Sequence, residues 1–433
     1  YEDDPRIKEI ISTRNTIDDL TKIFKTIKDY NGNLDLSGLR NAKGLILPQT
    51  ITGNLNLFGL KSAEGLILPE TINGNLNLSG LIVTSGLVLP KTINGYLDLS
   101  SLPSAEGLVL PETITGNLDL SGLTNAEGLI LSETMNGGLN LSGLTNAEGL
   151  ILPETMNGSL NLSGLMVTRG LVLPKTINGY LDLSGLTYSE GLILPETING
   201  GLNLGGLTNA EGLVLPQTIT GNLDINSLTS AEGLILPQTI NGSLSLRSLI
   251  GTRGLKLPKT IIGNLYLNRL KNVEGLVFPN EIGGLDLRRL ETAKDVVLPN
   301  IINGPLNLKN IKSVEGLVLP KTIGGDLDLS GLISTKGLVL PSTIYCLLNL
   351  KSLESAEGLI LPNELGSLDL RGLRSAEGLV LPSTIYGFLD LSSLTNLSGL
   401  IIPNELNCTL KCPIANNDIH VLKEMCKENY KQE

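Results

Sequence analysis

The sequence contains almost no aromatic residues and hardly any of the residue types that usually carry enzyme chemistry. Among its 433 residues there are no Trp, four Phe, nine Tyr and one histidine, His420. Because large aromatic side chains normally dominate a globular core, this chain must build its core from Leu, Ile and Val. A Ser-His-Asp or Cys-His centre could form only around His420, so we predict no enzyme activity and no catalytic residues.

Positive charge is scarce as well. The chain has 32 Lys and Arg against 43 Asp and Glu, a net charge of −11. This balance repels nucleic-acid phosphates and anionic membranes, and no apolar run is long enough to form a spanning helix. We therefore expect neither nucleic-acid binding nor membrane insertion. The partners that remain are another protein or a second copy of this chain.

Cysteine is too rare for a disulfide framework in a chain of this length. The four cysteines are Cys346, Cys408, Cys412 and Cys426. The last three, together with His420, could supply four zinc ligands, but their spacing matches no standard zinc motif. Free thiols, a disulfide and a bound metal stay open for these three, and we predict no metal site and no cofactor.

What the sequence has in abundance is a single repeated pattern. A Leu-x-Leu-Pro segment recurs from Pro48 to Pro403 in eighteen registers, with Ser132 in one proline slot. The step is 21 residues, except for two steps of 20 that end at Pro299 and Pro382. Such strict periodicity is typical of a solenoid, in which stacked coils bury one another's apolar side chains. We predict an all-β repeat fold, a parallel β-solenoid of about 18 coils of 21 residues with helical caps; a leucine-rich-repeat-like solenoid is the alternative.

The ends of the chain differ from the repeat and predict caps for the open solenoid edges. Residues 1–30 are expected to form an N-terminal helical cap, because apolar spacing over residues 5–29 fits two short helices broken near Asn15. The 21-residue-repeat β-solenoid covers residues 31–406. Residues 407–433 are expected to form a C-terminal cap with a helix whose inward side chains are Ile419, Leu422 and Cys426.

Each coil is expected to contain two extended segments with both leucines of a Leu-x-Leu motif directed inward. In one representative coil these segments are residues 149–153 and residues 160–162, separated by an Asn157-Gly158 turn. The middle residue of each motif then points outward and forms a ladder along the stack. The apolar ladder includes Ile130, Ile151, Val172, Ile193, Val214 and Ile235. The polar ladder includes Asp98, Asp119, Asn140, Asn161, Asp182, Asn203 and Asp224.

The two ladders suggest different roles. The apolar ladder is the candidate binding face, because a large contiguous exposed apolar patch usually marks an interface. The polar ladder has a structural explanation, solubility and amide bonding along the stack, and a functional one, attraction of a cation or cationic partner. Lys256 interrupts the first ladder and Tyr266 the second, so a ligand spot, if one exists, is expected there.

A second, longer repeat of four coils is superimposed on the 21-residue repeat. Every four coils, a corner with Ile-Val-Thr or a close variant replaces the usual Thr-Asn-Ala-Glu, first at Thr84 and then at Thr168, Thr252 and Thr335. We interpret this as duplication of a four-coil block, with a functional pattern as the alternative.

Stretches such as GGDLDLSGLISTKGLVLPSTI and NGSLNLSGL resemble the Gly-x-Leu-x-Leu-x-x-Leu repeats of bacterial and phage-associated proteins. More loosely, they are similar to leucine-rich repeats of bacterial effectors and surface proteins. The resemblance spans residues 31–406, but Leu60, Leu81 and Leu102 occupy the slot that holds a buried Asn in leucine-rich repeats, which favours a β-solenoid. The resemblance implies a recognition scaffold, often at a host or cell surface. It leaves the partner and compartment open, with a secreted or cell-surface protein favoured.

We therefore predict a non-enzymatic protein-recognition scaffold that binds its partner through a solenoid face. A structural self-assembling protein is the alternative. A polysaccharide-acting β-helix enzyme is less favoured: Asp98 and Asp119, one coil apart, could imitate a glycosidase pair, but the sequence shows no unique cleft and no aromatic platform.

Overall fold

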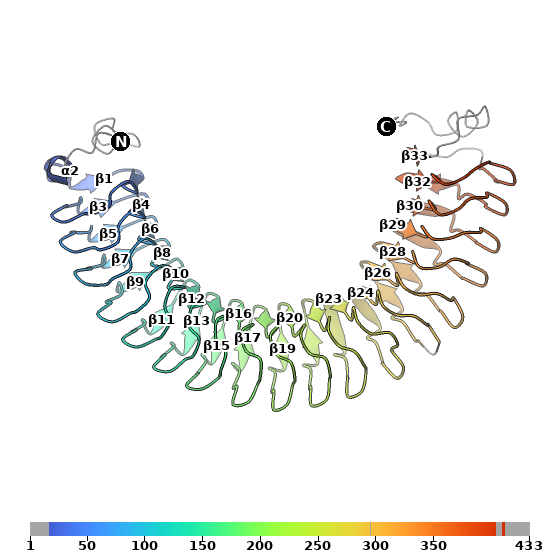
Figure 1. Ribbon diagram of the computed structural model, residues 1–433, viewed down its shortest axis with the longest axis horizontal. Coiled ribbons are helices and arrows are strands. Elements are labelled where there is room, and N and C mark those ends of the chain that lie inside the picture. The colour runs from blue at the N-terminus through green and yellow to red at the C-terminus, as the bar shows by residue number, and fades with distance from the viewer. Residues whose placement is uncertain (1–16, 295, 404–408, 412–433) are drawn as a thin grey trace. The chain divides into compact units, whose positions relative to one another are not determined.

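The computed structural model describes residues 17–294, 296–403 and 409–411. The chain is a parallel β-solenoid of about eighteen coils spaced about 21 residues apart, with almost no helix, as the repeat predicts. Its coils fall into two compact units, Tyr1–Leu207 with Gly212–Gly221, and Thr208–Glu211 with Asn222–Glu433. Within each unit, successive coils stack on one another in chain order (Figure 1).

A typical coil carries two short strands separated by a turn. In the representative coil these are β13 (Thr155–Met156) and β14 (Leu160–Asn161), and the Asn157-Gly158 pair lies between them. A β-branched Thr begins the first strand and favours an extended backbone, while the Asn-Gly pair favours a turn. The first unit repeats this arrangement from coil to coil.

The first strand of each coil in unit 1 is named by its bounds as follows: β1 (Asp29–Tyr30), β3 (Thr50–Ile51), β5 (Thr71–Ile72), β7 (Thr92–Ile93), β9 (Thr113–Ile114), β11 (Thr134–Met135), β15 (Thr176–Ile177), β17 (Thr197–Ile198) and β19 (Thr218–Ile219). The second strands are β2 (Leu34–Asp35), β4 (Leu55–Asn56), β6 (Leu76–Asn77), β8 (Leu97–Asp98), β10 (Leu118–Asp119), β12 (Leu139–Asn140), β16 (Leu181–Asp182) and β18 (Leu202–Asn203).

Unit 2 contains the same two kinds of strand and four longer ones. The short strands are β20 (Leu223–Asp224), β21 (Thr239–Ile240), β22 (Leu244–Ser245), β25 (Ile301–Ile302), β26 (Leu306–Asn307), β27 (Thr322–Ile323), β28 (Leu327–Asp328), β31 (Thr384–Ile385), β32 (Phe388–Asp390) and β33 (Thr409–Lys411). In the longer strands both segments have merged: β23 (Thr260–Tyr266), β24 (Glu281–Asp286), β29 (Thr343–Asn349) and β30 (Glu364–Asp369).

Two of the merged strands, β24 and β30, lie in the two 20-residue coils, and the other two, β23 and β29, lie in the coils just before them. In β24 and β30 one residue of the turn is missing, so the two strands run together, and each pairs with its predecessor through a register shift. Both short coils also share Leu-Asp-Leu-Arg after the turn. Asp286 is buried and held by Arg288, and Asp369 is buried and held by Arg371 at 2.7 Å. The deletion is therefore accommodated by local strand fusion.

Strands of neighbouring coils pair in parallel and in register. Leu160 pairs with Leu139 on one side and Leu181 on the other. Equivalent side chains of successive coils therefore lie directly above one another, about 4.8 Å apart. The core consists of these stacked columns: Met156, Leu160, Leu162 and others like them are 0 % exposed. The predicted leucine column is present in both units.

Residues 149–153, predicted as the first of the two extended segments of the coil, form no strand. Among the described residues, this part of the coil pairs with its neighbour only through the isolated bridges Ile46↔Ile67 and Val380↔Ile401. Pro153 has no N–H to donate, and Gly149 has a φ of 77° that interrupts extended backbone. Leu150 is buried as predicted, but Leu152 is only half-buried. The first strand instead occupies residues 155–156, which lie between the two predicted segments and just before the Asn157-Gly158 turn.

Part of the predicted N-terminal cap is present. Helix α2 (Ile17–Phe24) buries Leu20 and Phe24, and Thr21 Oγ1 joins it to the adjoining coil by donating to Gly44 O and accepting from Ile46 N, each at 3.3 Å. The helix predicted before it lies outside the described residues. So do the predicted C-terminal helix and the residues Cys408, Cys412, His420 and Cys426.

Candidate functional site

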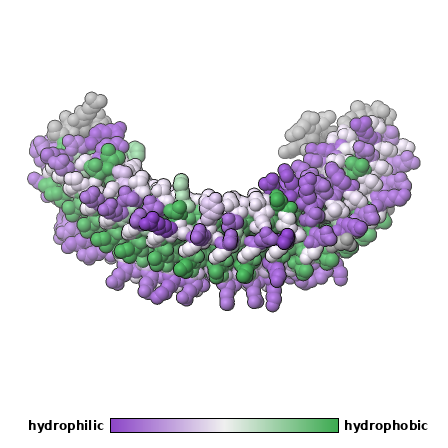
Figure 2. Space-filling model, turned by 60° about the horizontal axis from the view of Figure 1, so that its bottom comes forward, coloured by the Kyte–Doolittle hydropathy of each residue, from purple (hydrophilic) through white to green (hydrophobic). Residues whose placement is uncertain are grey.

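The apolar row, defined as the outward Ile or Val of each Gly-Leu-x-Leu segment, is the most exposed apolar feature of the molecule. In unit 1, Ile130, Ile151, Val172, Ile193 and Val214 are each 74–81 % exposed. Figure 2 shows apolar side chains following one another from coil to coil on the face drawn, with polar side chains beside them. These side chains stay three-quarters exposed, although the same coils bury leucines. They are therefore available for contact with another molecule.

Unit 2 carries its own stretch of the apolar row. Ile235 precedes the interruption at Lys256, and Val277, Val297, Val318, Val339 and Ile360 follow it, each 73–81 % exposed. The row ends with Val380 and Ile401, which are less exposed. The predicted outward direction of the ladder is thus confirmed in each unit, whereas its binding role stays a prediction.

The backbone beneath the apolar row is open as well. In the described part of the chain, no backbone hydrogen bond joins the segment of Ile151 to those of Ile130 or Val172. Exposed glutamates, among them Glu148 and Glu190, stand three residues before members of the row. The face is therefore apolar along its centre, and one margin is mostly acidic but is interrupted by basic residues such as Arg169.

The recurring Thr corners widen the apolar surface. Thr84 Oγ1 and Thr168 Oγ1 each donate to a backbone carbonyl of the next coil, at 2.5 and 2.6 Å. This fixes the corner and leaves Met166 and Val167 exposed beside it. Thr84 and Thr168 thus have a structural role, and the exposed apolar pair before each of them adds contact area.

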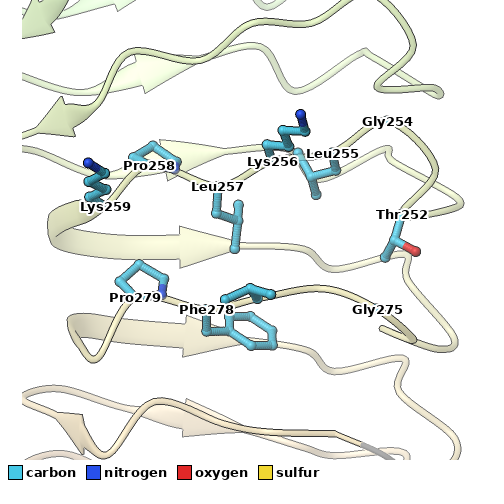
Figure 3. A pocket seen from close by; sticks show the side chains of 11 residues that line it. Thr252, Gly254, Leu255, Lys256, Leu257, Pro258, Lys259, Gly275, Phe278 and Pro279 are labelled. Carbon is cyan, nitrogen blue, oxygen red and sulfur yellow. The ribbon is translucent and has the colours of Figure 1, made fainter.

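The interruption at Lys256 lies at a depression in unit 2. It has a volume of about 670 Å³ and lies between the segments of residues 254–259 and 275–279. Figure 3 shows Lys256 and Lys259 extending to the same side of their segment while Leu257 points the opposite way. Phe278 replaces the usual leucine of the next coil. Lys256 therefore places positive charge at the break in the apolar row.

Tyr266 does not line that depression. It lies on the strand side of the coil, where Arg247 is 4.3 Å from its ring centroid and Asn264 Nδ2 donates to its hydroxyl at 3.0 Å. The first contact is a cation–π interaction. The structure thus assigns the two predicted irregular residues to different surroundings, each with local contacts of its own.

The polar row, the Asp or Asn between the second pair of leucines, has a structural role that the sequence analysis missed. Most of its residues are half-buried, and their Oδ1 accepts from the backbone N–H two residues later. This is an Asx turn, repeated coil after coil. Examples with N···O distances of 2.8–3.2 Å are centred on Asp98, Asp119, Asn140, Asn161, Asp182, Asn203 and Asp224. The row therefore stabilises the corner that follows each strand.

Two further polar columns also escaped the sequence analysis. In the Asn-Gly turn, Asn178 Nδ2 donates to Asn157 Oδ1 at 3.1 Å, and Asn199 continues the ladder at 2.7 Å. In the position before each second Leu-x-Leu, Asn54 Oδ1 accepts from the N–H of Asn75 at 2.8 Å. The recurrence of Asn at both places was a visible signal in the sequence. These columns replace water contacts along the stack with contacts between coils.

The most perturbed ionisable groups in unit 1 are Tyr96 and Asp119. The Tyr96 hydroxyl donates to Asp119 Oδ2 at 3.0 Å, and Asn140 Nδ2 donates to the same oxygen at 3.2 Å. Burial and the bond to Asp119 raise the pKa of Tyr96 well above its usual range. Burial alone would raise the pKa of Asp119, but hydrogen bonds from Ser121, Tyr96 and Asn140 outweigh it and lower that pKa below 3.8.

Among the described residues, no group of three or more His, Cys, Asp or Glu is placed to hold a metal ion. No helix among those residues has the length and apolarity needed to cross a membrane. Cys346, which lies within that part, is an exposed free thiol.

Fold and surface together define a β-solenoid repeat protein with an exposed apolar row. No protein-family model, curated protein or solved structure matches this chain.

Proposed function

We propose that the protein is a non-enzymatic recognition scaffold that binds a partner protein through the apolar row. The observation that supports this most strongly is the sustained exposure of Ile and Val in a chain that buries most of its leucines. Full burial of one such side chain contributes about 1.5–3 kcal/mol. Several adjacent coils must therefore contribute together, because association itself costs about 4–15 kcal/mol.

The charge beside the row indicates what kind of partner fits. Glutamates such as Glu127, Glu148 and Glu190 border the apolar centre, and the chain as a whole carries −11. Complementary charge speeds association and selects among partners. The partner surface is accordingly an apolar strip flanked by Lys or Arg. A secreted or cell-surface location is part of this proposal and follows from the repeat resemblance.

The test substitutes two neighbouring members of the row and compares them with a matched control. The double variant Val172→Lys, Ile193→Lys adds two positive charges to the row, and Glu148→Lys adds the same charge beside it. Partner capture by chemical crosslinking, followed by affinity measurement on the captured protein, is expected to fail with the double variant. Glu148→Lys leaves the apolar row intact but reverses one bordering charge, so it is expected to slow association and to weaken binding less than the double variant does.

The oligomeric state of the purified chain separates the proposal from its alternative. A structural self-assembling protein would associate through the same row, and sedimentation of the wild type would show oligomers that the double lysine variant loses. A monomer whose partner binding depends on the row supports the recognition scaffold. If neither association nor partner binding changes in the double variant, the row is not the binding face.

A further inference from the structure

A hollow in unit 1 lies on the strand side of the coils, in the column of residues that precede each second Leu-x-Leu. Asn is the most frequent residue at this position, in six of the eighteen coils, and the Oδ1 of Asn33 and of Asn54 accepts from the N–H of the next coil. Gly138 has no side chain there, and Ser159 of the following coil has a short one. The result is an open cavity of about 450 Å³, lined also by Tyr96, Asp119, Asn140 and Asn161.

The aromatic wall of this hollow is fixed in position. Tyr96 lies one coil before Asp119, and its hydroxyl bonds the carboxylate across the coil boundary at 3.0 Å. Asn140 holds the same carboxylate oxygen from the far side. The ring is thus held before any ligand arrives, which lowers the entropy lost on binding. A tyrosine ring offers a flat apolar surface beside polar groups.

The remaining walls offer hydrogen-bonding groups with capacity to spare. Asn161 Oδ1 accepts from Ser163 N at 3.0 Å, while its Nδ2 donates to no group within the described residues. Ser159 Oγ accepts from Tyr180 N at 3.0 Å and keeps its own proton to donate. Donors and acceptors therefore face the hollow together, as a ligand rich in hydroxyl groups requires.

The charge of the hollow restricts the class of ligand. Asp119 is the one ionisable carboxylate among the residues that line it, and it repels anions. That carboxylate already accepts three hydrogen bonds, so it is poorly available to a cation. No lysine or arginine lines the cavity. An uncharged ligand with an apolar ring face and several hydroxyls matches every wall.

We infer that this hollow is a binding site for a neutral carbohydrate, with one sugar ring stacked on Tyr96 and its hydroxyls bonded to Ser159 and Asn161. The cavity volume is within the roughly 300–1,000 Å³ typical of small-ligand sites. Its open side suits a ring within a longer chain. The site is independent of the apolar row and adds a second binding activity to the proposed scaffold.

The four-coil block supplies a sequence comparison inside unit 1. Tyr180 stands 84 residues after Tyr96, but Asn203 replaces the equivalent of Asp119 and Gly201 replaces the equivalent of Asn117. The arrangement of ring, carboxylate and Gly138 hollow is therefore particular to the first of these two tyrosines. Repetition of the block alone does not account for it.

The decisive variant is Gly138→Asn, which introduces the residue that Asn54, Asn75 and Asn117 supply at the same position of other coils. A Cβ at Gly138 would lie 3.2 Å from Asn117 Oδ1 and from Ser159 O. Asn75 occupies the same position above Asn54 with its N–H bonded in the same way. The new side chain is therefore expected to fit the fold while filling the hollow. Circular dichroism and thermal melting check that the fold is kept.

The probes are the neutral disaccharides cellobiose, lactose and N,N′-diacetylchitobiose, measured by saturation-transfer NMR and calorimetry. At least one is expected to bind the wild type with millimolar affinity. Gly138→Asn and Tyr96→Ala are each expected to weaken that binding at least about tenfold, equivalent to about 1.4 kcal/mol. Tyr188→Ala removes an exposed tyrosine outside the hollow and is expected to leave affinity unchanged.

Three results would overturn the inference. The first is that none of the three disaccharides binds the wild type. The second is that Gly138→Asn, correctly folded, binds as the wild type does. The third is that Tyr188→Ala weakens binding as much as Tyr96→Ala, which would locate the sugar elsewhere. None of these depends on the apolar row, so failure of the proposed scaffold function would leave this test intact.

Discussion

Replacing one buried leucine and one exposed isoleucine of the same coil compares how much an inward and an outward side chain contribute to stability. Leu160 is 0 % exposed, and its column partners Leu139 and Leu181 are also buried. Leu160→Ala leaves a cavity inside this column, and such substitutions cost about 2–5 kcal/mol. Ile151 is 77 % exposed, so Ile151→Ala is expected to cost at most about 0.5 kcal/mol.

The assay must resolve local opening, because each coil contacts only its neighbours and a long array need not unfold in one step. Hydrogen–deuterium exchange, read on peptides covering residues 139–181, measures the free energy of that opening. A loss of about 3 kcal/mol corresponds to roughly a hundredfold faster exchange in Leu160→Ala. Comparable acceleration in both variants would refute the assignment of inward and outward faces.

Two further predictions concern the turns. Gly164→Ala places a Cβ against the carbonyl of Ser142 in the preceding coil, so it is expected to separate two coils and lower the melting temperature. The control is Gly251→Ala, whose Cβ would meet nothing within 4 Å. Equal melting temperatures of the two variants would contradict the close stacking of the coils at Gly164. Asp119→Asn keeps an Asx oxygen but removes the charge. Because the folded pKa of Asp119 lies below 3.8, the charged carboxylate stabilises the fold above that pH and loses this effect as pH falls through the folded pKa. Urea titration is expected to show a difference in unfolding free energy between wild type and variant at neutral pH, and this difference is expected to shrink in acid. A difference that stays constant with pH would contradict this role of the charge.

The periodicity was sufficient to predict the solenoid, because a 21-residue coil with two turns has room for little except short strands. It also identified the outward position of Ile151 and the inward position of Leu160. The strand location was mistaken because alternation of Leu and Ile in residues 149–153 suits a strand, while ladder pairing depends on backbone donors that Pro153 and the positive φ of Gly149 disrupt.

The polar features were harder to predict for a different reason. Asp119 was expected to face outward in the polar ladder, where it would keep the sheet soluble or attract a cation, but the turn two residues later brings a backbone N–H to its Oδ1. The hollow at Gly138 depends on an absent side chain, together with a hydrogen bond between Tyr96 and Asp119 in the next coil. Neither can be derived from alternation along a single coil.

Hydroxyl-radical footprinting of the intact chain tests whether the Ile and Val of the apolar row face water while the leucines lie in the core, since oxidation of an aliphatic side chain depends on its contact with water. We expect rapid oxidation of Ile151, Val172 and Ile193, and protection of Leu160, Leu181 and Leu202. Protected Ile and Val with oxidised leucines would contradict this expectation.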